Sequence, residues 1–493
     1  MTHVVIGDAK GIFIPPLADY PIGRKALRGL RFIHTHLSNE PLNQDDLTDL
    51  SLLRFDIIAA VGVKDGQPAG MYVAHLLPQG TGVPYEVLPV EDFYRHTVDF
   101  KPFISALEEE LERARGFEVP GKGSTRSERT GRERAILVTV SLKPKYEQED
   151  SADELRELAE SSDVFVLDSV VQRPKEINPK YLMGEGKIKE LVITAMNKGA
   201  TLLIFDQDLT PSQIKSISEL TELKVIDRSQ LILDIFARRA HSRDGKVQVE
   251  LAQLKYRLPR LTGKGTAMSR LMGGIGGRGP GEMKLEIDRR RVRDRIGLLE
   301  KELKTLSKAR SQRKSRRVQA KIPIVSIIGY TNAGKSTLLN ALTKSRTFVE
   351  DKLFATLDTA SRRLRFPRER EVVITDTVGF IRDLPKDLMT AFRATLEELE
   401  DADLLLHVVD ASSPRFEQHI ASVERILSDL NLGDKKRLLV FNKTDRLGRG
   451  EIDSLTTRFG AVGVSALDTN TFGTLLSLIE GILFGEKLIE AKV

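Results

Sequence analysis

The sequence predicts a multidomain α/β protein, and three observations support that prediction. Between residues 135 and 227, apolar runs that favour strands alternate with amphipathic helical patterns, as in a small α/β domain. Residues 228–321 carry two leucine-rich seams with heptad spacing, which favour a pair of long helices. From residue 322, an apolar strand leads into a glycine-rich loop and then a helix. A chain of 493 residues has room for about three domains of ordinary size.

Residues 1–115 are predicted to form an accessory α+β domain. Apolar runs at 55–63 and 71–77 flank the turn-forming residues 64–68, a pattern typical of a β-hairpin. Residues 98–115 favour a helix with a glutamate-rich face. No catalytic constellation is present in this region, so its role stays unassigned.

The first domain includes His34, His36, His75 and His96. Their spacing matches none of the usual metal-binding templates. We therefore expect ordinary surface or packing roles for them.

Residues 116–134 are rich in Gly, Ser, Thr and Arg and poor in apolar side chains, which indicates a linker. The next domain is expected over 135–227. Its predicted strands cover 135–140, 163–170 and 201–205, and its predicted helices cover 152–160, 188–198 and a segment opened by Thr210-Pro211. The loop Gly184-Glu185-Gly186-Lys187 indicates a tight helix entry, with a second anion or nucleotide site as the alternative.

Residues 228–321 are expected to form an arm of two antiparallel helices. The first seam is Leu251, Leu254, Leu258 and Leu261; the second is Leu285, Val292, Ile296, Leu299, Leu303 and Leu306. Burying one seam against the other makes a hairpin. The segment between them, 273–281, is so rich in glycine that we expect a mobile loop at the hairpin tip.

The positive charge of the chain is concentrated on this arm. Residues 289–321 hold 14 Lys/Arg against 3 Asp/Glu, a local charge of +11, whereas the rest of the chain sums to −5. We interpret this segment as a phosphate-backbone contact, with a solvated charged face as the alternative. Few aromatic residues interleave the basic ones, so stacking on bases is disfavoured. The candidate RNA contacts are Arg270, Arg278, Arg289, Arg290, Arg291, Arg313, Lys314, Arg316 and Arg317.

A phosphate-binding motif follows the arm. The stretch Gly329-Tyr330-Thr331-Asn332-Ala333-Gly334-Lys335-Ser336-Thr337 matches G-x-x-x-x-G-K-[ST] between an apolar strand and a helix, which is the context that a P-loop requires. Its backbone N–H groups and the helix N-terminus favour phosphate oxygens. Lys335 is expected to reach the β- and γ-phosphates, and the Ser336 hydroxyl to bind Mg²⁺. For this motif alone, a chance match is the alternative.

Downstream elements favour GTP over ATP. Asp376-Thr377-Val378-Gly379 ends an apolar strand, where Asp376 is expected to hold Mg²⁺ through water and Gly379 N–H to sense the γ-phosphate. In Asn442-Lys443-Thr444-Asp445, the Asp445 carboxylate can accept hydrogen bonds from guanine N1–H and N2–H₂, which adenine does not offer. Ser465-Ala466-Leu467 fits the last guanine element, whose backbone N–H meets O6.

The first switch is expected over 351–358, which contains Phe354-Ala355-Thr356-Leu357-Asp358. Thr356 is the candidate that completes the Mg²⁺ shell, and Lys335, Thr356 and Gly379 are the expected catalytic residues. The fold predicted for 322–485 is therefore a P-loop, Ras-like G domain that binds GTP and GDP, followed by a tail over 486–493.

Phe380 stands where Ras-like enzymes carry a Gln that orients the attacking water. Phenylalanine cannot do this, so intrinsic hydrolysis is expected to be slow unless another group or a partner positions the water. Asn332 offers one route, because it can help to coordinate a K⁺ ion that supplies charge. The alternative is that Asn332 only shapes the loop.

Composition also bears on the compartment in which the protein acts. The chain has no Cys, no basic-then-apolar signal at its start, and no run that approaches the ~18 apolar residues of a membrane span. We expect a cytoplasmic monomer with no transmembrane segment, and peripheral association with a membrane stays open.

With these motifs placed, the chain closely resembles the HflX family of ribosome-associated GTPases over about residues 135–485. The resemblance is carried by residues 181–187, 249–261, 276–282, 288–291, 354–358 and 376–380. Residues 1–115 lie outside the usual core of that family, and the chain stops soon after the G domain, where some members carry a small extra domain.

The resemblance implies a GTPase that docks on the large (50S) ribosomal subunit, with the domain before the arm and the glycine-rich loop directed toward the peptidyl-transferase region. It implies splitting or rescue of stalled ribosomes under stress such as heat, ribosomal RNA as the partner of the basic arm, and stimulation of hydrolysis by the ribosome. The family's N-terminal domain is also linked to ATP binding. One rival function is an RNA-remodelling ATPase or GTPase that acts on ribosomal RNA through residues 135–227; another is a switch that hardly turns over.

Overall fold

The computed structural model describes residues 14, 26–78, 84–95, 99–116, 133–221, 223–261, 280–319, 322–343, 354, 360–366, 370–377, 379–382 and 399–485. The chain divides into two compact units, Met1–Asp227 and Arg228–Val493. Within the described residues, no helix is long and apolar enough to cross a membrane.

The first sheet belongs to the N-terminal region and has the strand order β1-β2-β3-β4, with β5 paired to β3. These strands are β1 (Arg31–His36), β2 (Ile57–Lys64), β3 (Gln67–Leu76), β4 (Tyr85–Val87) and β5 (Glu91–Asp92). β2 and β3 pair antiparallel, which confirms the predicted hairpin, and β1 runs parallel to β2. Helix α2 (Phe100–Gly116) confirms the predicted helix, and η1 (Phe93–Arg95) is a short 3₁₀ turn before it.

Helix α1 (Gln44–Leu53) connects β1 to β2 and was not predicted. Its start is fixed by a capping box: Asp46 N–H donates to Asn43 Oδ1 at 2.9 Å, and Asn43 N–H donates to Asp46 Oδ2 at 2.8 Å. Leu47 and Leu50 pack from α1 into the core of this sheet, where Leu50 is fully buried. The capping box therefore fixes the Asp46 carboxylate at the first turn of the helix.

The second sheet has four parallel strands in the order β7-β6-β8-β9. The strands are β6 (Arg134–Val140), β7 (Phe165–Gln172), β8 (Leu202–Phe205) and β9 (Lys224–Asp227); the helices are α4 (Lys145–Ser161), α5 (Glu185–Asn197) and α6 (Pro211–Leu220). The predicted α/β alternation is confirmed, with β9 as an additional strand. Thr210 caps α6 through Gln213 N–H, with Pro211 at the first helical position as expected.

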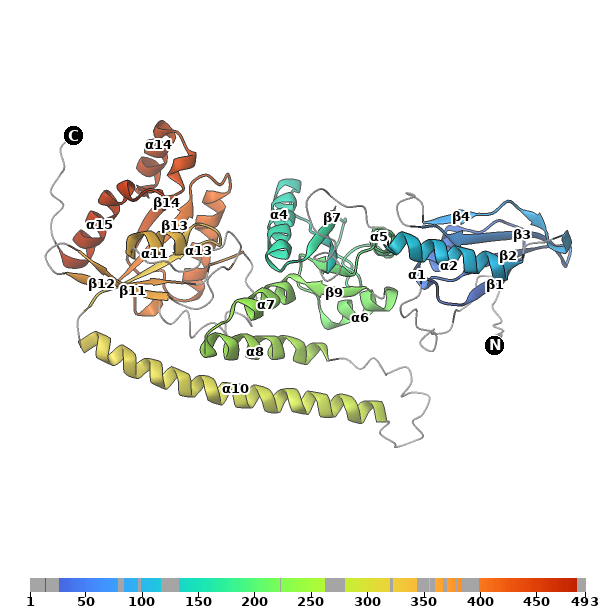
Figure 1. Ribbon diagram of the computed structural model, residues 1–493, viewed down its shortest axis with the longest axis horizontal. Helices are drawn as coiled ribbons and strands as arrows, with labels where there is room; N and C mark the ends of the chain where they lie inside the picture. The colour runs from blue at the N-terminus through green and yellow to red at the C-terminus, as the bar shows by residue number, and fades with distance from the viewer. Residues whose placement is uncertain are drawn as a thin grey trace. The chain divides into compact units, whose positions relative to one another are not determined.

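The arm consists of α7 (Arg228–Arg239), α8 (Arg243–Arg257), the 3₁₀ turn η2 (Leu258–Arg260) and α10 (Pro280–Gln319). Figure 1 shows α8 and α10 side by side. Their contact buries Val247, Leu251 and Leu299, with Leu254, Ile296 and Leu303 around them. Ion pairs from Arg243 to Glu302 at 2.8 Å and from Arg295 to Glu250 at 2.7 Å fix the antiparallel register.

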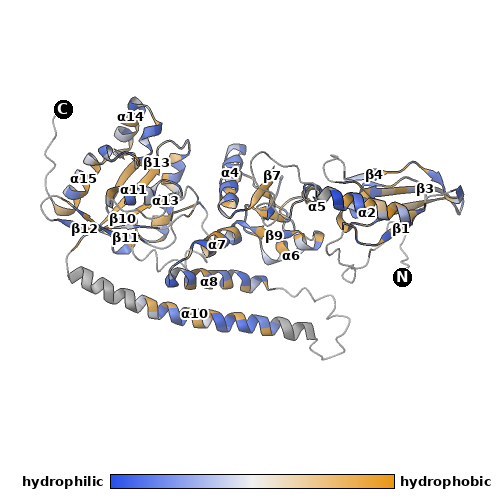
Figure 2. Cartoon of the chain, in the orientation of Figure 1, coloured by the Kyte–Doolittle hydropathy of each residue, from blue (hydrophilic) through white to orange (hydrophobic). Residues whose placement is uncertain are grey.

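Two features of the arm differ from prediction. The first helix is shorter than its seam, because Pro259 has no N–H to donate and the chain tightens into η2 from Leu258. Leu258 and Leu261 therefore lie beyond α8. Much of the described part of α10 is hydrophilic, with only interspersed apolar residues (Figure 2), so its contact with α8 is a narrow stripe. The predicted tip loop, 273–281, lies outside the described residues except for Pro280 and Gly281.

The sheet of the second unit has the order β11-β12-β10-β13-β14-β15, with β11 antiparallel to β12 and the other pairs parallel. The strands are β10 (Ile324–Gly329), β11 (Ala360–Arg365), β12 (Glu371–Asp376), β13 (Leu404–Asp410), β14 (Arg437–Asn442) and β15 (Val462–Gly463). The helices are α11 (Lys335–Thr343), α13 (Phe416–Asp429), α14 (Arg449–Phe459) and α15 (Gly473–Phe484), with 3₁₀ turns η3 (Thr444–Arg446) and η4 (Thr469–Phe472). Because β10, β12, β13 and β14 are parallel, their carboxyl ends meet at one edge of the sheet.

The α8–α10 contact yields a prediction. Leu299 is 1% exposed, whereas its neighbour Leu298 is 58% exposed. Leu299→Ala should cost about 2–5 kcal/mol of local stability, because it removes buried methyl groups and leaves a cavity. Hydrogen exchange of α10 amides should accelerate accordingly. Leu298→Ala is the matched control and should change stability by less than about 0.5 kcal/mol. Equal effects of the two substitutions would contradict the packing.

Candidate nucleotide-binding site

The P-loop lies at the carboxyl end of β10 and continues into α11, as the motif predicts. Gly329 has a φ of +149° and passes so close to β13 that an added Cβ would lie 2.1 Å from the Val408 carbonyl oxygen. Gly334 has a φ of +86°, and its Cβ would lie 2.3 Å from Asn442 Nδ2. Side chains are excluded at both positions. The loop therefore keeps a bare backbone where phosphate oxygens need N–H groups.

Lys335 is buried at the start of α11. Its Nζ donates to the Tyr330 carbonyl oxygen at 2.6 Å, across the loop. Burial lowers the pKa of the Lys335 ammonium from 10.5 to about 8, and the charge of Asp376 offsets part of that shift. An additional anion close to Nζ would stabilise the ammonium form, and a polyphosphate supplies that anion.

Ser336 and Asp376 meet beside the loop. The Ser336 hydroxyl donates to Asp376 Oδ2 at 2.5 Å. Thr377, the next residue, donates from Oγ1 to the Ile327 carbonyl oxygen at 2.6 Å and so anchors the end of β12 to β10. A hydroxyl oxygen and a carboxylate oxygen at this separation are hard ligands of the kind that Mg²⁺ prefers. The donor set therefore fits the ion that the sequence predicts.

Phe380 joins the second switch to the P-loop through its backbone. Its carbonyl accepts from Thr331 N–H at 2.8 Å, and its own N–H donates to the Gly329 carbonyl at 3.1 Å. The Phe380 side chain is 2% exposed. It is therefore a packing residue and presents no polar group to a water molecule.

The guanine motif follows β14. Asp445 Oδ1 accepts from the Ser465 hydroxyl at 2.6 Å, which links the two predicted base-recognition elements. Lys443 has a φ of +61°, and its Nζ lies 2.7 Å from Asp410 Oδ2. Asn442 is buried; its Nδ2 donates to the Ala333 carbonyl, and its Oδ1 accepts from Ala466 N–H, both at 2.9 Å. The motif residues thus converge on one edge of the sheet.

Sequence reasoning missed several of these contacts. Asp410, at the end of β13, holds Lys443 and was not predicted. Tyr330 was assigned only by its place in the motif, yet its ring stacks on His419 at 4.1 Å between centroids, and its hydroxyl accepts from Arg382 N–H at 2.9 Å. The position of Asp410 at the end of a parallel strand was the available signal.

Some predicted site residues cannot be placed. Ala355, Thr356, Leu357, Asp358 and Val378 lie outside the described residues. Phe354 is described: it is buried, and its ring contacts Phe236 of α7 at 4.6 Å between centroids. Asn332 is exposed with a φ of +61°, a conformation that Asn tolerates better than most residues. This supports its loop-shaping role and leaves the K⁺ hypothesis untested.

The basic candidates on the arm are placed in part. Arg289 donates to the Leu261 carbonyl oxygen at 2.8 Å, Arg291 lies 3.9 Å from Asp288, and Arg290 is exposed. Side chains of Arg313, Lys314, Arg316 and Arg317, and all of Arg270 and Arg278, lie outside the described residues. In the other unit, Lys187 pairs with Glu190 at 2.8 Å, which favours the helix-entry interpretation of residues 184–187.

The guanine-recognition geometry yields a prediction. Asp445→Asn should weaken GTP binding by at least about 30-fold, because an amide cannot accept from both N1–H and N2–H₂ of the base. The variant should gain affinity for xanthosine triphosphate, whose 2-oxo group accepts from the new amide. Titration calorimetry with both nucleotides measures the exchange. Unchanged GTP affinity would exclude Asp445 from the base site.

The buried Lys335 ammonium yields a second prediction for this site. In the nucleotide-free protein, Lys335→Met should raise the free energy of unfolding of the G domain by about 1–2 kcal/mol, because removal of the desolvated charge outweighs the loss of one hydrogen bond. The gain should fade as pH rises from about 8 toward 10.5, where folded wild-type Lys335 loses its proton before the unfolded chain does. Urea unfolding at several pH values tests this, with the exposed Lys436→Met as control. A destabilised variant would contradict the electrostatic argument.

Comparisons with known proteins agree with this geometry. Three family models match: the GTP-binding GTPase N-terminal region over 149–237, the GTP-binding GTPase middle region over 239–317, and the 50S ribosome-binding GTPase over 324–443. Among solved structures, a GTP-binding protein from Sulfolobus solfataricus in complex with GDP aligns with 72% of this chain at 25% identity. Its TM-score of 0.39 supports no structural inference.

Curated relatives extend across most of the chain. GTPase HflX of Caldanaerobacter subterraneus subsp. tengcongensis is 53% identical over 316 residues, which is 64% of this chain and 73% of that protein. GTPase HflX of Escherichia coli strain K12 is 45% identical over 315 residues, or 64% of this chain and 74% of that protein. Together with the P-loop and guanine-motif geometry, these matches show that the chain is a GTPase and belongs to the HflX family.

Proposed function

We propose that this GTPase acts on the large ribosomal subunit, in the cytoplasm and as a monomer, and that its nucleotide cycle helps to split or rescue stalled ribosomes. The match to the 50S ribosome-binding GTPase model supports the partner. The positive charge gathered on α10 supports contact with ribosomal RNA, since phosphate contacts dominate such binding.

In this proposal the P-loop holds the phosphates, Lys335 contacts the β- and γ-phosphates, and Asp445 reads the guanine. Ser336 holds Mg²⁺ directly and Asp376 holds it through water, with Thr356 as the remaining protein ligand. The ion supplies charge that stabilises the phosphoryl transition state. Gly379 N–H contacts the γ-phosphate, so the second switch responds to the loss of that phosphate.

The burial of Phe380 carries the proposal. At 2% exposure, this side chain cannot orient a water molecule beside the γ-phosphate. His407 is also a poor base, because burial, together with the positive charges of Arg437 and Lys335, lowers its pKa to about 3. Efficient turnover therefore needs a group that a partner supplies or induces, and the ribosome is the partner that the family match favours.

A potassium ion near Asn332 is the other source of positive charge. Asn332 is exposed on the P-loop, so its side chain is accessible to an ion beside the phosphates. This role is separable from that of the ribosome, because it follows the monovalent cation in the buffer.

The proposal is tested by GTP turnover with and without purified large ribosomal subunits, in K⁺ and in Na⁺ buffers. We expect strong stimulation by the subunit. Stimulation that requires K⁺ and is lost in Asn332→Ala assigns part of the effect to the ion. Equal turnover with and without subunits, together with no binding to them, would refute the ribosomal role and leave the GTPase intact.

The RNA contact is tested by the salt dependence of subunit binding. Arg290→Gln/Arg291→Gln should reduce the slope of log affinity against log salt by about 1–2, because each phosphate contact releases counterions. Lys64→Gln/Lys101→Gln removes the same charge from exposed positions of the N-terminal region, which lies outside the family's core, and is the matched control. Equal slopes in the two double variants would exclude this part of α10 from the contact.

A further inference from the structure

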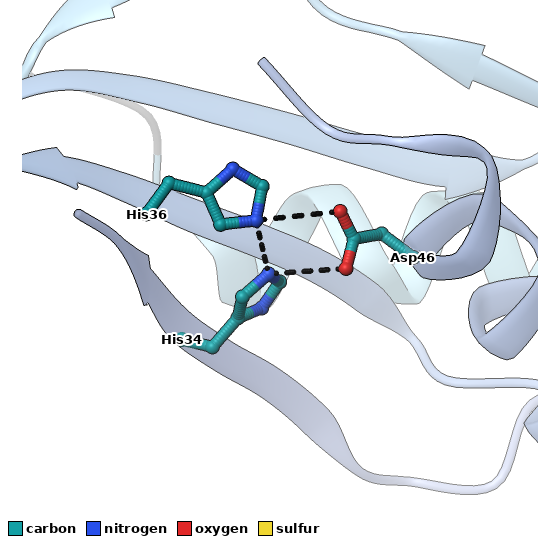
Figure 3. Close-up of side chains that lie close together, drawn as sticks. All are labelled: His34, His36 and Asp46. Atoms are coloured by element: carbon teal, nitrogen blue, oxygen red, sulfur yellow. Dashed lines mark hydrogen bonds and ion pairs between the residues drawn. The ribbon is translucent and has the colours of Figure 1, made fainter. Parts of the chain in front are cut away.

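Two histidines and an aspartate converge in the N-terminal region, in a geometry that the sequence spacing did not predict. His34 and His36 alternate with exposed residues on β1, so both point to the same side of the sheet, toward the start of α1. Asp46 stands there in the first turn of α1. Figure 3 shows both imidazole rings directed toward the Asp46 carboxylate. Among the residues that the structure describes, this is the one group of three potential metal ligands.

Each of the three residues offers one ligand atom, and these atoms lie within 4.8 Å of one another. His34 Nε2 and His36 Nε2 are 2.9 Å apart. His34 Nε2 lies 3.2 Å from Asp46 Oδ1, and His36 Nε2 lies 3.4 Å from Asp46 Oδ2. Ligands bound to zinc at 2.0–2.1 Å in a tetrahedron are separated by about 3.3 Å. The separations from His34 Nε2 to His36 Nε2 and to Asp46 Oδ1 lie within about 0.4 Å of this value, and the remaining pair of ligand atoms lies within 4.8 Å, so the cluster would close modestly around an ion.

The surroundings orient His36 and Asp46. His36 Nδ1 lies 2.9 Å from the Glu40 carbonyl oxygen, which can only accept, so Nδ1 carries the proton and the Nε2 lone pair faces the cluster. Metal-bound histidines are typically held by this kind of outer hydrogen bond. Asp46 Oδ2 accepts from Asn43 N–H at 2.8 Å, which leaves Oδ1 as the oxygen available to a ligand.

Burial and charge favour a cation at this point. The side chains of His34, His36 and Asp46 are 7%, 8% and 14% exposed, so the ligands are desolvated yet reachable. Asp45 and Asp46 place two carboxylates in the first turn of α1. This local negative charge favours a bound cation.

We propose that His34, His36 and Asp46 form a binding site for a divalent transition-metal ion, with Zn²⁺ as the preferred occupant. Two imidazole nitrogens and one carboxylate suit Zn²⁺ and related ions, whereas Mg²⁺ and Ca²⁺ prefer oxygen ligands throughout. Three protein ligands leave at least one coordination position for water or a small ligand, as in zinc sites that are not purely structural. None of its three residues belongs to the P-loop, the switches or the guanine motifs.

Zinc competition tests the proposal on the full chain. The protein is stripped with a chelator, freed of nucleotide and titrated with Zn²⁺ against a chromophoric chelator. Wild type should bind one more tight equivalent than Asp46→Asn, or bind it at least tenfold more tightly. This variant keeps an oxygen that can accept from Asn43 N–H, so the helix cap survives. His75→Gln is the matched control, because His75 pairs with Glu86 and lies outside the cluster.

Cobalt substitution supplies a readout that does not depend on stability. Bound Co²⁺ should show visible d–d bands typical of nitrogen and oxygen ligands at low coordination number, and the bands should vanish in His34→Gln and in Asp46→Asn. Added azide should shift the bands if a position is open. Unaltered circular dichroism and GTP affinity would show that the variants are folded. Equal metal binding by wild type and Asp46→Asn, or no tight binding by either, would overturn the proposal and leave a metal-free hydrogen-bonded cluster.

Discussion

The nucleotide site depends on one buried amide. Asn442 is 1% exposed and makes two hydrogen bonds of 2.9 Å, one to the Ala333 carbonyl in the P-loop and one from Ala466 N–H in the last guanine element. One side chain thus joins the loop that binds phosphates to the loop that meets the base. Both hydrogen bonds matter, because a buried amide without partners would lower the stability of the folded protein. The spacing between the two halves of the site is therefore set before a nucleotide arrives, which reduces the entropy lost on binding.

At Lys335, by contrast, a feature that serves phosphate binding lowers the stability of the nucleotide-free protein. Burial without an anionic ligand lowers its pKa to about 8, so the free protein carries an electrostatic cost that phosphates would remove. Functional residues often violate local stability rules in this way, and the rest of the fold compensates. Here the compensation is visible in the parallel strands around the loop, where Val325, Ile327 and Val408 are fully buried.

The parts of this protein that follow local rules were readable from sequence. The P-loop, the hairpin of β2 and β3, and the cap at Thr210 each depend on residues close together in the chain. The pairing of Asp410 with Lys443 depends on which strands are neighbours, and motif spacing carries no information about that. The end of α8 was predictable in principle, because Pro259 marks it. The leucine seam continues past Pro259 to Leu261, and the predicted helix followed the seam.

The cluster of His34, His36 and Asp46 escaped prediction for a related reason. Its ligands come from alternate positions of a strand and from the first turn of a helix, a combination that matches no short template. The family models begin at residue 149 and so do not include this region. Its ligand chemistry nevertheless separates it from the nucleotide site. Imidazole nitrogens favour zinc-like ions, whereas the hydroxyl and carboxylate oxygens of Ser336 and Asp376 favour magnesium. The proposed site and the nucleotide site therefore offer different donor sets, so we expect each to prefer a different ion.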